Sequence, residues 1–497
     1  MRMNRWSQCA AAAMVIVSAV CLSGRPSPAT GDPSDSDGTP QTSVLVSGIP
    51  LGTNIPPEFL GFSFEASALD TDEFAPDRPV LIRLFTNLGV AVARFGGNTL
   101  DQSAWAPAGI FEGATSTVTP ADLRRMFDFT RQAGWKVLLG LDLGHYDPEA
   151  AADEAATAML LGTGTLEAFE FGNEPDLYVR TYAGALRPSS YGVQEYLREW
   201  RAYLVAVRRR VPGARVVGPS IAGTPGGVEL LRALAEEEHN EIVFATSHHY
   251  PLGAPITDPS SPAYASIPNL VSADLRAREL AEIGGWVRTV TDAGQSLRLT
   301  ETNSVFGGGK HGVSDTLAGA LWTIDYLFRT AQLGMIGINL HATLDQCGGY
   351  TPICAPTRSD AEADRFRVQP NYYALLMFHL AAQGRFVPTK VTPNASITAY
   401  ATRGTDGLTR IVMVNFGTQP ATVGIRVTNA TADIVGGLIR LGGPSLDATD
   451  GVTLGDGVVA PDGTWTMGPQ QPVAFERGRT SVTLPGASAT LLTVSSP

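Results

Sequence analysis

The stretch that decides the fold holds a strand, a helix and a second strand in succession. It runs from AFEF at 168–171, through VQEYLREWRAYLVAVRRRV at 193–211, to RVVGP at 215–219. The middle segment repeats its apolar residues at i, i+3, i+4 and i+7, which is the period of an amphipathic helix. Short apolar runs that alternate with such helices are typical of parallel β/α units.

The same alternation extends over most of the chain and predicts an α/β fold. Eight units make a (β/α)8 TIM barrel the natural count, and we assign the barrel to residues 43–385. The eight candidate strands are Phe59–Phe64, Val90–Phe95, Lys136–Leu141, Ala168–Phe171, Arg215–Pro219, Ile242–Ser247, Ser296–Thr300 and Met335–Leu340.

After about residue 385 the helical period disappears. Short runs divided by Gly, Asp and Pro predict an antiparallel β-sandwich domain over residues 386–497. Residues 43–50, through the run Val44–Val46, could add a strand to this sandwich. The candidate sandwich strands are Ser396–Ala401, Thr409–Asn415, Ala421–Val427 and Thr480–Leu484.

The N-terminal residues 1–29 have the form of a secretory signal peptide. Arg2 and Arg5 precede the apolar segment from Ala10 to Leu22, and small residues follow it. Residues 30–42 have the composition of a solvated linker. We therefore expect a secreted or periplasmic protein. The residues before Cys21 do not favour lipid attachment there, and no other stretch is long and apolar enough to span a membrane.

Charge excludes some partners. The net charge is −12, and the only basic run is Arg208–Arg210. That run lies near the end of a predicted helix, where cations interact favourably with the helix dipole. Nucleic-acid binding normally requires a basic patch, so we expect no nucleic-acid partner.

The cysteines outside the signal peptide are Cys347 and Cys354, which flank a turn rich in Gly and Pro. In an exported protein such a pair predicts a disulfide. A zinc site is disfavoured, because no pair of His or Cys residues lies beside them at ligand spacing.

Two glutamates follow barrel strands, and the C-terminal strand ends are where barrel sites lie. Glu174 ends the fourth strand in GNEP at 172–175, and Glu301 ends the seventh in TETN at 300–303. Pro175 restricts the backbone of Glu174, and a partly desolvated Glu there could donate a proton. Retaining glycosidases use two carboxyl groups about 5–5.5 Å apart. One of the pair acts as nucleophile and the other as acid and then base, whereas inverting enzymes need a wider gap for a water.

Other strand ends suit a sugar site. Arg94 could orient the nucleophile and lower its pKa, and Asn98 and Asp101 suit hydroxyl groups. Adjacent His248 and His249 point to opposite sides of an extended strand, so hydrogen bonds to Glu301 or substrate are favoured over a metal.

A glycine-rich segment follows Glu301. In Phe306-Gly307-Gly308-Gly309-Lys310 the backbone N–H groups could form an anion-sized nest, to which Lys310 adds charge. The alternative is a flexible loop.

The combined motifs resemble glycoside hydrolase family 79, which holds β-glucuronidases and heparanases, over nearly the whole mature chain. The motifs are RFGG at 94–97, GNEP at 172–175, HHY at 248–250, TETNS at 300–304, GGG at 307–309, the helix at 314–327 and QPNYY at 369–373.

The resemblance implies roles for individual residues. It implies Glu174 as acid/base and Glu301 as nucleophile. It also implies that Glu65, Asn98 and Asn173 hold sugar hydroxyls. It suggests that the amides of Gly307 and Gly308, with Tyr350, receive a uronate carboxylate. Tyr250 and Phe306 belong to the same substrate site, with Arg94 and His249 in support. Heparanase-like sequences have Tyr where this chain has Phe306, so one hydroxyl contact is missing.

The predicted activity is that of a retaining exo-β-glucuronidase that releases terminal β-D-glucuronic acid from glucuronide-containing oligosaccharides or glycosides. No metal or other cofactor is expected. The alternatives are an endo-acting heparanase-like enzyme, a β-xylosidase or arabinofuranosidase on the same machinery, and a non-catalytic carbohydrate-binding protein. The low number of Lys residues and the acidic charge favour exo action on weakly charged glycans.

Overall fold

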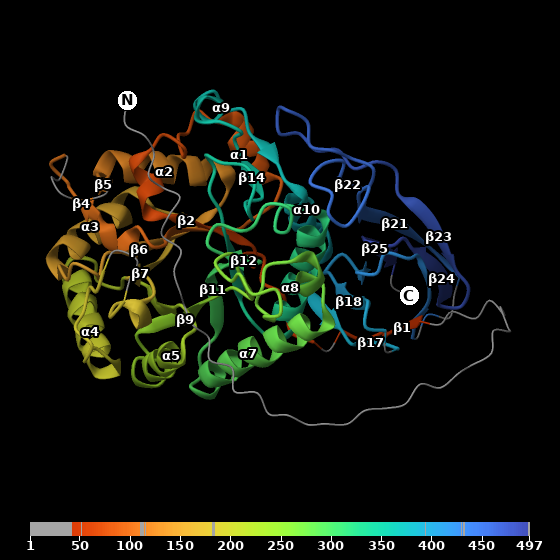
Figure 1. Ribbon diagram of the computed structural model, residues 1–497, viewed down its shortest axis with the longest axis horizontal. Coiled ribbons are helices and arrows are strands. Elements are labelled where there is room, and N and C mark those ends of the chain that lie inside the picture. The colour runs from red at the N-terminus through yellow and green to blue at the C-terminus, as the bar shows by residue number, and fades with distance from the viewer. Residues whose placement is uncertain are drawn as a thin grey trace.

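The computed structural model describes residues 42–50, 52–109, 114, 116–180, 184–392, 394–428, 430 and 433–495. The predicted signal peptide and all but the last residue of the predicted linker lie outside the described residues. Figure 1 shows a barrel of strands and helices on one side and a body of sheets on the other. None of the described helices is long and apolar enough to cross a membrane.

Eight parallel strands close into a barrel, so the predicted fold class is confirmed. Every predicted strand lies within a few residues of an observed one. The strands are largely buried on both faces, because helices cover the outer face of a parallel barrel. In barrel order they are β2 (Gly61–Glu65), β3 (Val92–Gly96), β6 (Lys136–Leu141), β7 (Leu166–Phe171), β8 (Val216–Ile221), β9 (Ile242–His249), β11 (Leu297–Thr302) and β13 (Gly337–His341).

Helices cover the barrel, and several begin where the sequence places a proline in the first turn, which suits the fixed φ of that residue. The predicted helix is observed as α4, and its last-turn arginines pair with Glu149, Asp153 and Glu241. The main helices are α1 (Pro79–Thr86), α2 (Pro120–Ala133), α3 (Pro148–Leu161), α4 (Val193–Arg210), α5 (Pro225–Glu237), α7 (Ala273–Asp292), α8 (Leu317–Gln332) and α10 (Pro370–Ala381).

Short elements complete the loops around the barrel. They are η1 (Ala66–Asp70), η2 (Leu100–Gln102), η3 (Pro175–Leu177), α6 (Ile267–Leu270), α9 (Arg358–Glu362), β4 (Ser103–Trp105), β5 (Ser116–Val118), β10 (Leu252–Gly253), β12 (Val305–Phe306), β14 (Ile353–Cys354) and β15 (Arg367–Val368).

The C-terminal segment forms two sheets that enclose a separate apolar cluster. The larger sheet is antiparallel and contains β16 (Arg385–Val387), β18 (Ile397–Arg403), β19 (Leu408–Asn415), β21 (Ile434–Gly442), β22 (Thr453–Leu454), β23 (Gln471–Phe475) and β25 (Ser488–Ser495). The smaller has the order β17 (Thr389–Val391), β1 (Thr42–Val46), β20 (Ala421–Val427) and β24 (Arg479–Leu484). The N-terminal strand β1 thus pairs with the C-terminal segment, antiparallel to β17 and parallel to β20.

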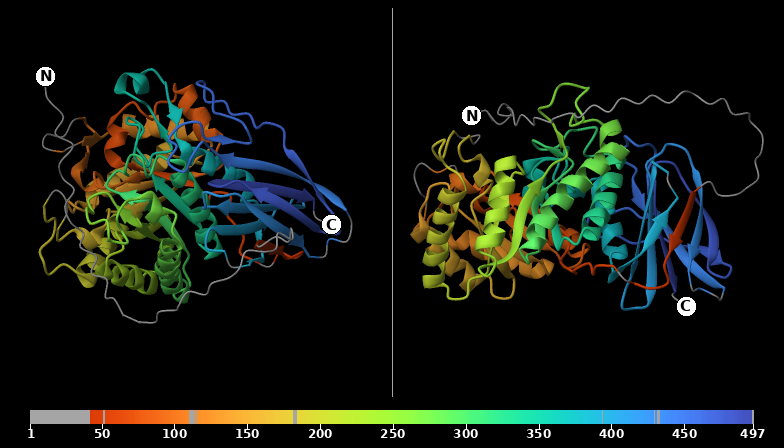
Figure 2. Two further views of the ribbon diagram at one scale, coloured as in Figure 1. Left: turned by 45° about the vertical axis from the view of Figure 1, so that its right-hand side comes forward. Right: turned by 90° about the horizontal axis from the view of Figure 1, so that it is seen from below.

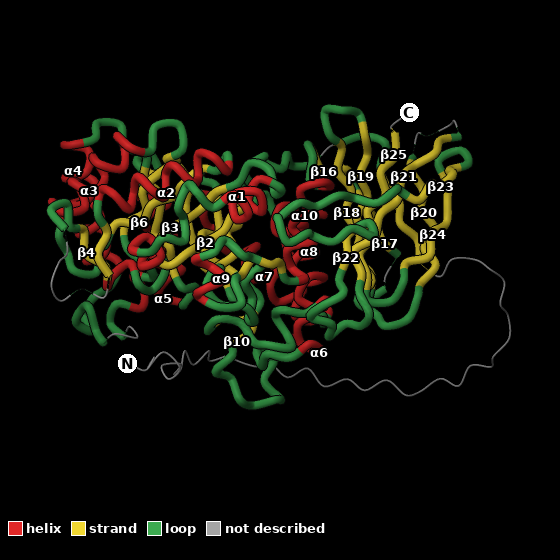
Figure 3. The backbone as a smooth tube through the Cα atoms, turned by 90° about the horizontal axis from the view of Figure 1, so that it is seen from above, coloured by secondary structure: helices red, strands yellow, loops and turns green. Residues whose placement is uncertain are grey.

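The sheets pack against the barrel on the side of α8 and α10 (Figures 2 and 3). The Phe328 and Tyr400 rings stack with centroids 5.2 Å apart. Asp325 of α8 accepts hydrogen bonds from Thr398 at 2.6 Å and Tyr400 at 2.7 Å. One apolar cluster runs from the barrel onto the large sheet. The division into two domains near residue 385 stays a prediction.

Candidate active site

Glu174 and Glu301 meet at the C-terminal end of the barrel strands. Glu174 follows β7, and Glu301 is the residue before the last in β11 (Leu297–Thr302). One oxygen of each carboxyl group and a ring nitrogen of His248 lie within 4.8 Å of one another. Carboxyl groups of retaining glycosidases are about 5–5.5 Å apart, whereas those of inverting enzymes are about 6.5–9.5 Å apart. The spacing matches the retaining geometry.

The backbone of Glu174 adopts an uncommon conformation. Its φ is 51° and its ψ is 55°, in the left-handed region that non-glycine residues rarely occupy. The Glu174 N–H donates to the carbonyl of Ser220 at 2.9 Å, and Pro175 then begins η3. Such strained residues persist only where their surroundings fix them, and they gather at functional sites.

Arg94 of β3 connects the residues around the pair. Its guanidinium is fully buried and donates to Glu170 at 2.9 Å, to Glu301 at 2.9 Å and to Asn173 Oδ1 at 2.9 Å. The rigid fork of arginine donors suits such multiple contacts. Arg94 lies where the sequence analysis expected a group that orients Glu301.

Glu301 is held as a carboxylate. Tyr250 donates its hydroxyl proton to Oε1 of Glu301 at 2.8 Å, and Arg94 donates to Oε2. Burial by itself would raise the pKa of Glu301, but the charges of His341, His248 and Arg94 and the Tyr250 hydrogen bond together lower that pKa to about 2. An ionised carboxylate of this kind is available as a nucleophile.

The pKa of Glu174 is raised, in contrast to that of Glu301. Its Oε1 lies 2.9 Å from Nδ1 of His248, whose Nε2 lies 2.8 Å from the hydroxyl of Ser220. Burial raises the pKa of Glu174, His248 partly opposes the rise, and the charge of Glu301 adds to it. Two carboxyl groups whose surroundings separate their pKa values in this way can divide acid and base roles.

His249 faces away from the carboxyl pair. Its Nδ1 lies 2.9 Å from the Tyr326 hydroxyl, and its Nε2 lies 3.7 Å from Glu282. The expectation that His249 supports Glu301 through a hydrogen bond is wrong. Alternation along β9 sends successive side chains to opposite faces, and only His248 points into the barrel mouth.

The residues expected to bind sugar hydroxyls line the same mouth. Oε2 of Glu65 accepts from the N–H and the hydroxyl of Thr99, both at 2.7 Å. Asn98 is exposed beside it. Oδ1 of Asn173 accepts a hydrogen bond from Arg94. Within the described part of the chain, Nδ2 of Asn173 has no hydrogen-bond partner. This amide group could therefore donate to a sugar.

Asp101 does not face this space. It is buried and accepts from the N–H groups of Gly144 at 2.9 Å and Asn173 at 3.4 Å. Burial and the charge of Asp142 raise the pKa of Asp101 to about 7. The expected contact between Asp101 and a sugar hydroxyl is replaced by a role in holding the backbone of Asn173.

Gly307, Gly308 and Gly309, the segment predicted to form a backbone nest, follow β12, and the N–H of Gly309 already donates to the carbonyl of Val305 at 3.1 Å. Their φ values are +84°, +88° and +84°. Gly307 and Gly308 are exposed, and the backbone of Gly308 partly opposes the rise that burial causes in the pKa of the Tyr350 hydroxyl. A Cβ on Gly309 would lie 2.4 Å from the backbone nitrogen of Tyr350, so only glycine permits this approach. Successive N–H groups of this kind can bind an anion.

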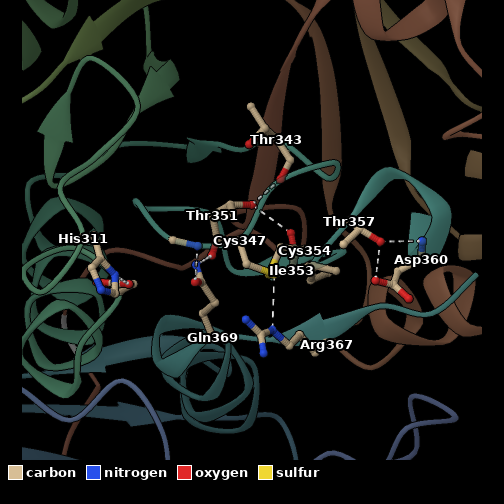
Figure 4. Close-up of a disulfide and its surroundings, with 12 residues drawn as sticks. His311, Thr343, Cys347, Thr351, Ile353, Cys354, Thr357, Asp360, Arg367 and Gln369 are labelled. Carbon is tan, nitrogen blue, oxygen red and sulfur yellow. Dashed lines mark hydrogen bonds and ion pairs between the residues drawn. A yellow bond between two sulfur atoms is a disulfide. The ribbon is translucent and has the colours of Figure 1, made fainter. Parts of the chain in front are cut away.

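Tyr350 is held by a short disulfide loop. Cys347 and Cys354 form the predicted disulfide, which is confirmed (Figure 4). Gln369 accepts from the N–H of Gly348 at 2.8 Å on the same loop. The Tyr350 ring stacks on Tyr250 with centroids 6.2 Å apart. The disulfide loop therefore ties one wall of the mouth to Tyr250, which contacts Glu301.

Phe306 and Lys310 flank the nest. β12, which contains Phe306, pairs in parallel with β10, and a Cβ on Gly253 would lie 2.3 Å from the Phe306 ring. Lys310 donates to the carbonyl of Ala265 at 2.8 Å and lies over the Tyr264 ring at 4.5 Å. The expectation that Lys310 adds its charge to the nest is wrong, because these contacts direct the ammonium group to the neighbouring loop.

Sequence reasoning missed three contributors. Glu170 is a fully buried charge within β7, and Ser220 contacts both Arg94 and His248. His341 ends β13 between Glu65 and Glu301. The rule that selected Glu174, a polar residue at a strand end, would also have selected His341.

One cluster of the described residues has the spacing of a metal site, namely Glu174, His248 and Glu301. Both ring nitrogens of His248 already have hydrogen-bonding partners. We assign no metal to these residues, and the predicted absence of a cofactor stays a prediction.

The fold and the carboxyl pair define the class, a (β/α)8 barrel with a glycosidase-type site. Among solved structures, a 4-O-α-L-rhamnosyl-β-D-glucuronidase from Fusarium oxysporum matches with a TM-score of 0.73 and 17% identity over 89% of this chain and 97% of that chain. A family 51 α-L-arabinofuranosidase from Bifidobacterium longum matches with a TM-score of 0.67 and 17% identity over 92% of this chain and 99% of that chain.

Sequence comparison narrows the class. No family model matches the chain. The chain is 28% identical over 314 residues to a β-glucuronidase of Neurospora crassa, which covers 57% of this chain and 52% of the relative. It is 23% identical over 288 residues to a heparanase of Mus musculus, and this match covers 56% of this chain and 50% of the heparanase. It thus spans about half the length of the curated relatives it matches. The chain is thus similar in sequence to β-glucuronidases and heparanases, in agreement with the resemblance to glycoside hydrolase family 79.

Proposed function

We propose that the protein is a retaining β-glucuronidase that releases terminal β-D-glucuronic acid by exo action. The observation that carries the proposal is the carboxyl pair, in which one member has a lowered pKa and the other a raised pKa within retaining distance. The β-glucuronidase relatives support the substrate class.

The reaction has two steps. In the first, the Glu301 carboxylate attacks the anomeric carbon, and Glu174 gives its proton to the departing glycosidic oxygen. A covalent glucuronyl ester of Glu301 results. In the second, the Glu174 carboxylate takes a proton from water as the water oxygen attacks the same carbon, and Glu301 leaves as a carboxylate. Two inversions retain the configuration.

His248 positions the acid/base. It contacts Glu174 through Nδ1 and is itself fixed through Nε2 by Ser220. The contact of Nε2 with Ser220 fixes the orientation of the ring, so Nδ1 stays directed at the carboxyl group of Glu174. This suits a residue that must donate a proton in one step and accept one in the next.

The glycine nest and Tyr350 support recognition of a uronate. Gly307 and Gly308 are exposed in the loop after β12, a short strand that follows the Glu301 strand β11 in the chain, and the Gly308 backbone acts on the Tyr350 hydroxyl. Backbone N–H groups and a phenol donate hydrogen bonds, which a carboxylate accepts and a neutral hydroxymethyl group uses less well. A sugar seated with its anomeric carbon at Glu301 would place its carboxylate on this wall.

Hydrolysis of 4-nitrophenyl β-D-glucuronide, compared with the β-xyloside, tests the proposal. We expect the glucuronide to be cleaved far faster and Glu301→Gln to abolish turnover. Faster cleavage of the xyloside would overturn the substrate class, and full activity of Glu301→Gln would overturn the mechanism. Tyr264→Phe, on a neighbouring loop, is the matched control and should retain activity.

The second candidate is an endo-acting heparanase-like activity, which the heparanase relatives favour. Its substrates are long anionic chains, and the net charge of −12 disfavours their approach. Product analysis on a glucuronide-capped oligosaccharide separates the two: exo action releases only the monosaccharide, whereas internal cleavage releases shorter oligosaccharides.

We further propose that the protein is exported through the predicted signal peptide. The disulfide supports an oxidising compartment, since such bonds persist there. N-terminal sequencing of protein recovered from the medium or periplasm should find a start near residue 30. Retention of the intact N-terminus on cytoplasmic protein would contradict export.

A further inference from the structure

His341 lies between two carboxyl groups at the end of β13. Its Nε2 is 3.5 Å from Oε1 of Glu65, and its Nδ1 is 3.5 Å from Oε2 of Glu301. The residue is only 5% exposed. Within the described part of the chain, the buried Nδ1 has no hydrogen-bond partner. The imidazole therefore has an acceptor oxygen on each side.

The protonation state of the ring follows from this arrangement. A neutral imidazole has one N–H and one lone pair, so one nitrogen would present its lone pair to a carboxylate. An imidazolium donates from both nitrogens. The charged groups that face the ring are Glu65 from β2, Glu301 from β11 and Arg94 from β3. The Tyr350 ring lies edge-on to it at 5.9 Å and 87°.

The surroundings of the His341 ring favour its protonated form. Burial lowers the pKa of His341, but the two carboxylates together raise it above its ordinary value despite the nearby Arg94. Glu65 is also fixed, because its other oxygen accepts two hydrogen bonds from Thr99. A Cβ on Gly97 would lie 2.5 Å from that carboxylate, so glycine there leaves room for it.

On the basis of the proposed function, we propose that His341 is a positioning residue that remains an imidazolium throughout the reaction, keeps Glu301 ionised and couples it to Glu65. Glu301 changes from a carboxylate to a neutral ester and back during the two displacement steps. Glu65 keeps its negative charge in both, so His341 keeps a counter-charge even when Glu301 is esterified. The imidazolium then stabilises Glu301 as the leaving carboxylate of the second step.

The first test is His341→Gln, which removes the charge but keeps a polar side chain. The acidic limb of the kcat/KM profile should move up by about one pH unit or more, because Glu301 loses one of its cationic neighbours. We expect kcat to fall about tenfold or more and KM to change less. His239→Gln, an exposed histidine away from the mouth, should leave the profile unchanged. An unmoved acidic limb in a folded His341→Gln protein would overturn the proposal.

The second test needs no turnover and no folded His341 variant. The chain contains seven histidines. Histidine NMR of the wild-type protein, labelled at the ring positions, should show a buried imidazolium that persists above the ordinary histidine pKa, in addition to any signal of His145, whose pKa Asp142 raises. Glu65→Gln should lower the pH at which that signal titrates, because one counter-charge is lost. If no imidazolium signal that titrates above the ordinary histidine pKa responds to Glu65→Gln, the inference is overturned. An inactive protein with the expected spectrum would instead reject the proposed function alone.

Discussion

The fully buried Arg94 donates from Nη1 to Oε2 of Glu301 at 2.9 Å, across the barrel mouth. The same guanidinium holds Glu170, a fully buried carboxylate, at 2.9 Å. The Arg94 cation is therefore the ion-pair partner of both Glu170, which is structural, and Glu301, which is predicted to react. Changes at Arg94 should affect stability and catalysis together.

Arg94→Met should lower turnover on 4-nitrophenyl β-D-glucuronide by about 10²-fold or more, since Glu301 loses its oriented donor. It should also lower the free energy of unfolding by about 3–5 kcal/mol, because Glu170 is left as an unpaired buried charge. Urea unfolding and steady-state kinetics measure the two effects. Adding Glu170→Gln to Arg94→Met should recover part of the stability but not the turnover. A fully active single variant would contradict the role of Arg94.

The pH dependence of kcat/KM should be bell-shaped. Activity requires ionised Glu301, so it is lost as pH falls through the folded-state pKa of about 2. Activity also requires protonated Glu174, so it is lost as pH rises through a pKa that lies above the ordinary carboxyl value. The acidic limb should therefore lie at unusually low pH, provided the protein remains folded there, which circular dichroism checks.

Glu174→Ala should separate substrates by leaving group. Glucuronides with good leaving groups, such as 4-nitrophenol, need little protonation and should retain much of their first-step rate. Alkyl glucuronides should lose activity by about 10²-fold or more. The alkaline limb should also disappear for the activated substrate. Equal losses on both substrates would argue against Glu174 as the acid.

Removing the disulfide with Cys347→Ser and Cys354→Ser should affect binding more than chemistry. The bond closes a loop with a sequence separation of 7 that carries Tyr350. Loop-closure entropy suggests a loss of roughly 2–3 kcal/mol in unfolding free energy. We expect KM for the glucuronide to rise several-fold with a smaller change in kcat, and reduced wild-type protein should behave alike. An unchanged KM at lower stability would show that Tyr350 does not depend on the bond.

Gly308→Ala tests the nest. Its φ of +88° disfavours any side chain, although a Cβ there would meet nothing within 4 Å. The expected result is a rise of about tenfold in KM for the glucuronide, because the backbone shifts away from the left-handed region. Gly312→Ala is the matched control, with a φ of +75° and open space around its Cβ. If both variants change KM equally, the nest does not bind the substrate.

Much of the fold could be predicted from local pattern. The eight barrel strands and helix α4 were located within a few residues, because apolar periodicity is a local property that burial imposes on each segment. Glu174 and Glu301 could be selected for a similar reason: polar residues directly after apolar strands must lie at the barrel mouth. The disulfide followed from two close cysteines on a turn.

Contacts between distant segments could not be predicted in this way. His249 was expected to form a hydrogen bond to Glu301 or to substrate and instead contacts Tyr326, because neighbouring side chains on β9 face opposite sides. Lys310 was expected at the glycine nest and instead contacts the loop around Ala265. In each case the backbone position followed from sequence, whereas the side-chain partner depended on which loop packed beside it.

The sequence by itself determined the eight-stranded barrel, the positions of the two glutamates at its mouth and the disulfide. These follow from periodicity and spacing, which are properties of single segments. Only the tertiary structure decided the distance between the glutamates, the opposite shifts in their pKa values and the placement of His341 between Glu65 and Glu301. Those depend on charges brought within a few ångströms from strands far apart in the chain, and electrostatic interactions in a buried site are set by that separation.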